Sequence, residues 1–123
     1  MQPLNVVLLQ SDSRVAQSLV SALANTFSSV RQVQSLGELR SSIAKNRAGI
    51  AILDMEKASI SDVAHLSREF PKACIVCTHR LADEEMWTAA LNAGAADICP
   101  SQDTRGILTA VMRSALRSQS LAA

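Results

Sequence analysis

Short apolar runs that alternate with amphipathic segments are the feature that most constrains how this chain can fold. Two of these runs, Leu4–Leu9 and Ala48–Leu53, are apolar at almost every position. Because successive side chains of a strand face opposite sides of a sheet, a continuous apolar run predicts a strand buried on both faces. Strands of that kind occur in parallel sheets covered by helices on both sides. The pattern therefore predicts an α/β domain.

The predicted elements alternate strictly between strand and helix along the chain. Strands are expected at 4–9, 30–34, 48–53, 73–77 and 96–99, and helices at 14–26, 36–46, 60–70, 83–92 and 107–117. Right-handed crossovers then favour a flavodoxin-like, doubly wound five-stranded parallel sheet with strand order 2-1-3-4-5. We expect one domain over residues 1–123, with 118–123 as a frayed tail or the start of a linker.

Composition excludes several classes of protein. An apolar fraction of 48% with 19% charged residues is incompatible with intrinsic disorder. Twelve Lys and Arg against eleven Asp and Glu give a net charge of +1, so direct binding of nucleic acid is not expected. The N-terminus carries no secretory signal and no run is long enough to cross a membrane. Three cysteines in apolar surroundings fit a reducing, cytoplasmic location.

Polar residues follow two strands that should be neighbours in the sheet. Gln10, Ser11 and Asp12 come directly after the first strand, and Asp54 ends the third. Ligand sites of doubly wound sheets lie outside the carboxyl ends of the strands, where the strand order reverses. We therefore expect these four residues to meet in one crevice.

Three motifs carry a resemblance to a known family. They are the strand ending Leu53-Asp54, the strand ending Cys77-Thr78, and the run Ala90–Asp97. Together they resemble a bacterial response-regulator receiver domain of the chemotaxis-regulator type, over about residues 4–117. The most specific part starts at Leu91, where the family typically reads Leu-x-x-Gly-Ala-x-Asp. The spacings of 24 residues from Asp54 to Thr78, and of 23 from there to Ser101, match without gaps.

The resemblance implies a phosphorylation pocket that is degenerate in this chain. In the family a histidine kinase supplies a phosphoryl group to an aspartate, here Asp54, and a hydroxyl, here Thr78, responds to it. The paired acids that hold Mg²⁺ match Gln10 and Ser11, and the conserved lysine matches Ser101. Because Mg²⁺ prefers anionic oxygen ligands, we expect weak or absent metal binding.

Two acidic residues of this pocket have alternative interpretations. Asp12 would supply a metal-binding acid only if the match slipped by one residue, and Mg²⁺ is a cofactor only in that case. The alternative, which the end of the apolar run favours, is that Asp12 is the N-cap of the first helix. Asp54 is either a phosphoacceptor or a strand-end carboxylate that accepts backbone N–H bonds.

A candidate interface comes from the same resemblance, which assigns dimerisation to the fourth helix, fifth strand and fifth helix. Its residues are Trp87, Leu91, Ile98, Arg113 and Arg117. Ile98 matches the family's switch aromatic but cannot form a hydrogen bond through its side chain. Trp87 either contacts a partner or packs on the sheet, and the two arginines either contact a partner or form a solvated face.

The remaining candidates for chemistry favour a structural role. Cys74 and Cys77 are three residues apart on a strand and so should point to opposite faces, which makes them core residues and not a redox pair. His65 and His79 lack partners at metal-ligand spacing, so no zinc site is expected.

Three hypotheses follow. In the first, the chain is an atypical receiver domain and not an enzyme, and it associates with a protein partner or an appended effector domain. The second hypothesis is a receiver phosphorylated on Asp54 by a histidine kinase. The third, a small α/β enzyme, is disfavoured because no pair of nucleophile and base can be assembled.

Overall fold

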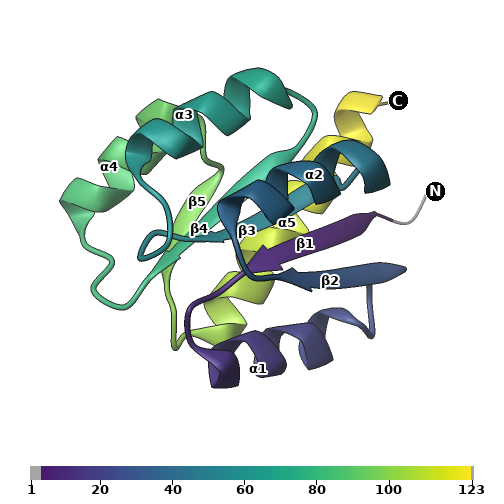
Figure 1. Ribbon diagram of the computed structural model, residues 1–123, viewed down its shortest axis with the longest axis horizontal. Coiled ribbons are helices and arrows are strands. Elements are labelled where there is room, and N and C mark those ends of the chain that lie inside the picture. Colours follow the sequence, from purple (N-terminus) through teal and green to yellow (C-terminus); the bar gives the residue numbers. More distant parts are fainter. Residues whose placement is uncertain (1–3, 123) are drawn as a thin grey trace.

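A computed structural model describes the backbone of residues 4–122 and the side chains of residues 4–117. It contains a five-stranded parallel sheet connected by helices (Figure 1). The elements in chain order are β1 (Asn5–Leu9), α1 (Ser13–Leu23), β2 (Ser29–Val33), α2 (Leu36–Asn46), β3 (Ile50–Asp54), α3 (Ile60–Glu69), β4 (Cys74–His79), α4 (Glu84–Ala93), β5 (Asp97–Pro100) and α5 (Thr104–Ala122).

The strand order is β2-β1-β3-β4-β5, which confirms the predicted topology. β1 pairs with both β2 and β3, so Val6 lies between Val30 and Ile50. At the other end of the central strands, Asp54 pairs with Thr78. The order reverses beside β1, which places the carboxyl ends of β1 and β3 at the expected switch point.

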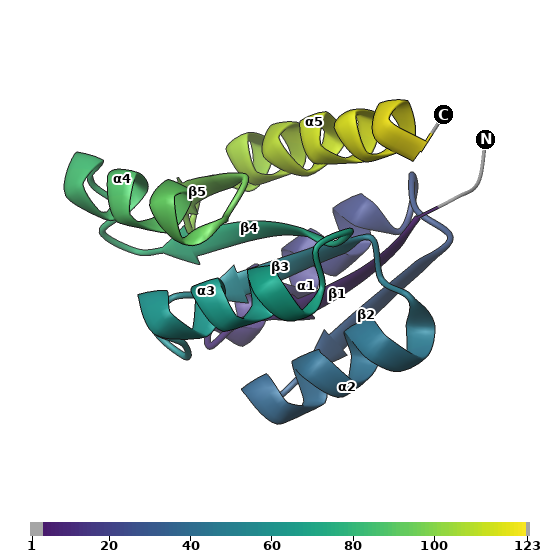
Figure 2. The same cartoon turned by 90° about the horizontal axis from the view of Figure 1, so that it is seen from above.

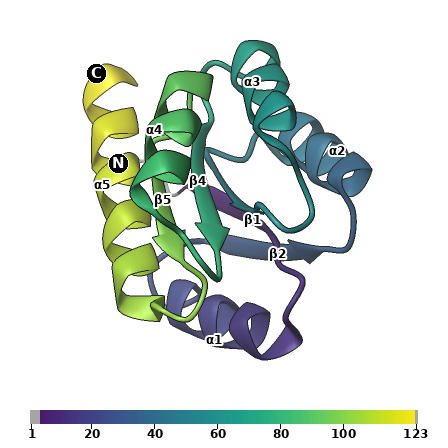
Figure 3. The same ribbon diagram turned by 90° about the vertical axis from the view of Figure 1, so that its left-hand side faces the viewer.

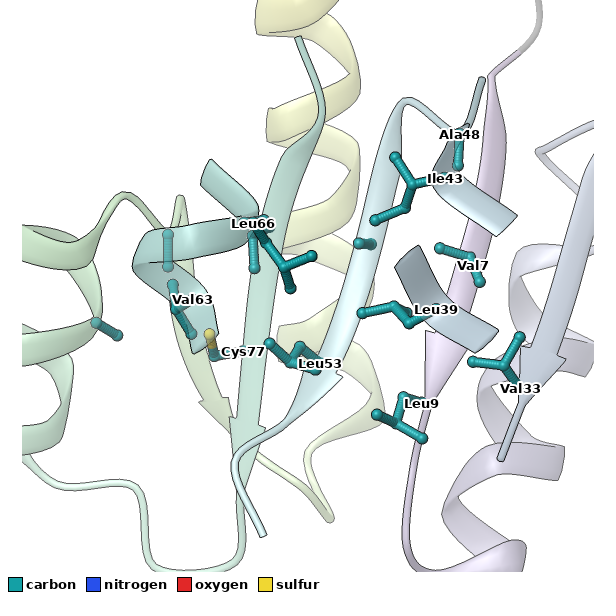
Figure 4. Close-up of a cluster of buried hydrophobic side chains, with 14 of the residues drawn as sticks. Val7, Leu9, Val33, Leu39, Ile43, Ala48, Leu53, Val63, Leu66 and Cys77 are labelled. Atoms are coloured by element: carbon teal, nitrogen blue, oxygen red, sulfur yellow. The ribbon is translucent and has the colours of Figure 1, made fainter. Parts of the chain in front are cut away.

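Helices cover both faces of the sheet, with α2, α3 and α4 on one face and α1 and α5 on the other (Figures 2 and 3). Alternate residues of each central strand enter the two apolar clusters, as the continuous apolar runs require. Leu9 and Leu53 pack under α2 and α3, together with Leu39 and Leu66 (Figure 4). Leu8 and Ile52 point to the opposite cluster.

Local sequence explains where two of the helices end. Gly94 closes α4 with φ +113°, a left-handed conformation that favours glycine, and its N–H donates to the carbonyls of Ala90 and Leu91. The predicted end of α1 at Thr26 was wrong, because the helix ends at Leu23. Thr26 and Phe27 both donate their N–H to the Leu23 carbonyl, in a turn that brings Phe27 onto the cluster formed by α1 and α5.

The last helix is longer than the sequence pattern suggested. Its backbone is helical as far as Ala122, and the fraying expected from Ser118 onward stays a prediction, with position 123 outside the described residues. The segment 118–122 contains no Gly or Pro and therefore nothing that breaks a helix. Among the described residues, no helix combines the length and the apolarity needed to cross a membrane.

Candidate functional site

The carboxyl ends of β1, β3 and β4 bring the predicted pocket residues together. Gln10 and Ser11 follow β1, Asp54 ends β3, and Thr78 is the Asp54 partner on β4. Asp54 is 1% exposed and Thr78 is fully buried. The juxtaposition predicted from the sequence is therefore present, and its chemistry depends on how these side chains are paired.

The carboxylate of Asp54 accepts three hydrogen bonds from its own chain. Oδ2 accepts from the Ser11 N–H at 2.7 Å and from the Ser11 hydroxyl at 2.5 Å. Oδ1 accepts from the Glu56 N–H at 2.9 Å. Both carboxylate oxygens are thus occupied by donors of the β1–α1 and β3–α3 loops, which is the arrangement expected of a structural acceptor at the end of a strand.

Asp12 does not take part in this arrangement. Its side chain accepts from the Arg14 N–H at 2.9 Å and forms the N-cap of α1, as predicted. Ser11, and not Asp12, contacts Asp54. The structure therefore brings Ser11 to Asp54 and keeps Asp12 at the helix N-terminus, so Asp12 supplies no second acid at the Asp54 carboxylate.

Gln10 is paired with the hydroxyl of Thr78. The amide Nε2 lies 2.6 Å from Thr78 Oγ1, and Gln10 is 6% exposed. Two buried polar atoms nearby, Gln10 Oε1 and Ser101 Oγ, have no hydrogen-bond partner within the described part of the protein. The threonine hydroxyl is therefore engaged by a side-chain amide in the position where the family has an acid.

Sequence reasoning missed an ion pair at the rim of the pocket. Arg80 Nε lies 2.6 Å from Glu56 Oε1, and Glu56 Oε2 lies 3.2 Å from the Ser11 hydroxyl. The Ser11 hydroxyl has one proton and donates it to Asp54, which is the closer of the two carboxylates. The signal was available, because Arg80 follows Glu56 by the same 24 residues that separate the register partners Asp54 and Thr78.

This set of residues does not fit a magnesium ion. Mg²⁺ requires near-octahedral oxygen ligands, with carboxylates among them. The Asp54 oxygens accept N–H and O–H donors, and the other nearby carboxylate, Glu56, is paired with Arg80. Among the described residues, no group of three or more His, Cys, Asp or Glu side chains is placed to hold a metal ion.

The candidate interface is only partly at the surface. Trp87 is 46% exposed on α4, and its Nε1–H donates to Asp97 Oδ1 on β5 at 3.3 Å. Arg113 and Arg117 are exposed on α5. Ile98 was wrongly included, because it is 7% exposed and packs into the cluster under α3 and α4. Ile98 is an apolar residue where the family has an aromatic switch residue, and its burial stabilises the fold.

Leu91 is half-buried one turn after Trp87, so only part of its side chain contributes to the exposed surface around Trp87.

The histidines lie outside any metal-binding group among the described residues. His65 is exposed, and His79 is half-buried with Nδ1 accepting the Leu81 N–H at 2.9 Å.

The three cysteines are free thiols that lie in the core or pack against it. Cys74 and Cys77 lie on opposite faces of the sheet, as predicted. Burial raises the pKa of the Cys77 thiol to about 12, and it raises the pKa of the Cys99 thiol to about 11. Burial also raises the pKa of Cys74, against a smaller lowering effect of Arg117. A raised pKa keeps a thiol protonated and unreactive near neutral pH.

Comparison with known proteins places this fold. No family model and no curated protein matches the sequence. A CheY-like response-regulator receiver domain protein from Methanospirillum hungatei matches with a TM-score of 0.83 at 15% identity, over 97% of this chain and 98% of that chain. The chain has the receiver-domain fold. The same comparison supports the flavodoxin-like topology expected from the sequence.

Longer response regulators match over one part of their length. RcsB of Salmonella typhimurium matches with a TM-score of 0.81 at 17% identity, over 95% of this chain and 61% of RcsB. NtrX from Brucella abortus matches with a TM-score of 0.85 at 11% identity, over 98% of this chain and 28% of NtrX. At these identities the likeness establishes the fold, and function has to be argued from the site.

Proposed function

We propose that this chain is an atypical receiver domain that functions by associating with proteins, without magnesium-dependent phosphorylation of Asp54. The observation that carries the proposal is the pairing of the Asp54 carboxylate with donors from Ser11 and Glu56. A carboxylate nucleophile attacks through a lone pair of one of its oxygens, and three of the roughly four lone-pair sites of Asp54 already accept hydrogen bonds. Phosphorylation here would compete with hydrogen bonds that hold two loops together.

The electrostatics of the pocket support the same proposal. A transferred phosphoryl group needs cations to neutralise its oxygens. Ser101 stands where the family has a lysine, and the nearby guanidinium of Arg80 is paired with Glu56. The metal that would supply further positive charge lacks a suitable set of ligands. The alternative function, a receiver phosphorylated by a histidine kinase, would need these pairs to be rearranged first.

Association is the function that this fold retains without its phosphorylation chemistry. Trp87 presents a half-exposed indole that is held against β5 by Asp97. Arg113 and Arg117 give α5 a basic surface, and α4 begins with the acidic run 83–85. Two copies related by a twofold axis can set the basic surface of one against the acidic start of α4 in the other. We therefore propose a homodimer through α4, β5 and α5.

An appended effector domain is the other partner that the fold suggests, since RcsB and NtrX extend well beyond the matched region. A cytoplasmic location for the proposed module fits its three free cysteines.

Sedimentation equilibrium tests the proposed dimer. Trp87→Ala should weaken dimerisation by about 2 kcal/mol, as truncation of a central aromatic residue does. Arg113→Glu should also weaken it, because it places like charges across the interface. His65→Ala, an exposed change on α3, is the control and should leave the dimer unchanged. A monomeric wild-type protein at high concentration, or a dimer indifferent to Trp87→Ala, would exclude this interface.

A further inference from the structure

A groove lies at the amino end of the sheet, opposite the Asp54 pocket. It forms where the C-terminal ends of α2 and α3 approach the starts of β1 and β3, and its volume is about 730 Å³. Figure 4 shows Ile43 and Ala48 at this end of the apolar cluster, away from Leu9 and Leu53. The volume falls within the range of small-molecule sites, which is roughly 300–1,000 Å³.

The floor of the groove is apolar. Ile43 and Ala48 are core residues, and Leu4, Phe70 and Ala73 are partly buried beside them. Most of the lining therefore offers no hydrogen bonds, so a ligand that fills the groove needs an apolar body.

The charged residues at the rim leave a surplus of positive charge. Arg47, Glu69 and Lys72 line the groove. Glu69 is already held by Arg40, whose Nε and Nη2 each lie 3.0 Å from a carboxylate oxygen. Arg47 and Lys72 form no ion pair within the part of the chain that the structure describes. The two cations are thus available for an anionic group at the mouth of the groove.

The backbone at Arg47 adds a second observation. Arg47 is the C-cap of α2 with φ 49° and ψ 48°, and it is the one non-glycine residue with positive φ in the described chain. Glycine adopts this left-handed conformation at lower cost than any residue with a side chain. Helix ends with this left-handed backbone favour glycine, yet here the position is occupied by Arg47, whose guanidinium lies at the groove.

We propose that this groove binds a monocarboxylate with an apolar body, of the medium-chain fatty acid class. The apolar body packs on Ile43 and Phe70, and the carboxylate is held by Arg47 and Lys72. The planar guanidinium presents paired donors that match the two oxygens of a carboxylate. The site is separate from Asp54 and does not depend on the function proposed for that end of the sheet.

Titration of the wild-type protein with dodecanoate below its micelle concentration, followed by amide NMR, tests the proposal. We expect saturable shifts at Ala44, Gly49 and Ala73. Arg47→Gly and Lys72→Gln should each weaken binding by about fivefold, the upper end for a solvent-exposed charge pair. Arg113→Gln, which removes an exposed cation from α5, is the matched control and should not change the affinity.

Four results would overturn the proposal. The first two are amide shifts that do not saturate and amide shifts that centre on the Trp87 surface. The third is equal binding of dodecyltrimethylammonium, which has the same alkyl chain with a cationic head group. The fourth is an Arg47→Gly variant that binds dodecanoate with wild-type affinity. Shifts that depend on protein concentration in place of ligand concentration would assign the groove to a second copy of the chain, which also overturns it.

Discussion

The two ends of the β-sheet differ in how their charged and polar side chains are partnered. At the carboxyl end, Asp54 accepts hydrogen bonds from Ser11 and from the Glu56 N–H, Glu56 is paired with Arg80, and Gln10 bonds to Thr78. Two neutral atoms there, Gln10 Oε1 and Ser101 Oγ, have no partner among the described residues. At the amino end, Arg47 and Lys72 border an apolar groove without forming an ion pair among the described residues. Charged groups that are paired within the protein stabilise the fold, whereas unpaired charged groups beside an apolar groove retain the capacity to bind a ligand.

The largest effect is expected at Asp54. Asp54→Ala removes the acceptor of three hydrogen bonds and should lower the free energy of unfolding by about 3 kcal/mol. Asp12→Ala is a matched control on the neighbouring loop, because that carboxylate accepts one backbone N–H, and it should cost about 1 kcal/mol. Urea denaturation measures both. Equal costs for the two variants, or a gain in stability in Asp54→Ala, would contradict a structural role for Asp54.

A smaller loss is expected from the pair formed by Gln10 and Thr78. Thr78→Val leaves the buried amide without its partner and should cost about 2 kcal/mol. Replacing both residues, as Gln10→Met with Thr78→Val, should recover much of that loss, because neither of these two positions then holds an unpaired polar group. Thr88→Val on the exposed side of α4 should change stability by less than about 0.5 kcal/mol. Additive costs in the double variant would show that the two side chains are not coupled.

Alkaline pH should weaken the core directly below the carboxyl-end pocket. The pKa of the Cys77 thiol rises from 9.0 to about 12 on burial. In the unfolded chain this thiol loses its proton near pH 9, while the folded protein keeps it. The contribution of Cys77 to the free energy of unfolding is therefore fully present below pH 9 and is lost as the pH rises toward 12. The slope is at most about 1.4 kcal/mol per pH unit. Cys77→Ala should flatten this part of the profile in urea denaturation, and an unchanged slope would contradict it.

The smallest effect, with the opposite sign, is expected at the amino end. Arg47→Gly should raise the free energy of unfolding by about 0.5 kcal/mol, because glycine adopts the left-handed conformation without strain. Lys45→Gly lies inside the last turn of the same helix and should instead cost about 1 kcal/mol. If both substitutions destabilise the protein equally, Arg47 is not held at the groove against a conformational cost.

Local signals in the sequence predicted most of the fold. The apolar runs predicted the strands, and right-handed crossovers predicted their order. Asp12 and Gly94 act as the helix caps expected from their residue types. Helix ends without such a signal were placed less well. α1 ends at Leu23, before Asn25 and Thr26, and the backbone of α5 continues to Ala122 through a segment without Gly or Pro.

The site was predictable as a location but not as a network. Ser11 and Asp54 could be placed together because strand ends meet at a known edge of the sheet, and the family resemblance added Thr78. Asp12 was expected in the same crevice but caps α1 instead. The contact between Glu56 and Arg80 joins two loops, and only the strand register brings these residues opposite each other. Ile98 was misplaced because the expectation rested on the family's residue, and its apolar side chain lies in the core here.

Treatment with a small acyl phosphate and Mg²⁺, followed by intact mass measurement, tests the central claim most directly. Wild-type protein should gain no phosphoryl group. The variant Gln10→Asp/Ser11→Asp/Ser101→Lys, which restores the acids and the lysine of the family, is the positive control and should gain one group, which Asp54→Asn in the same background abolishes. A wild-type protein that gains a phosphoryl group on Asp54 would contradict the account.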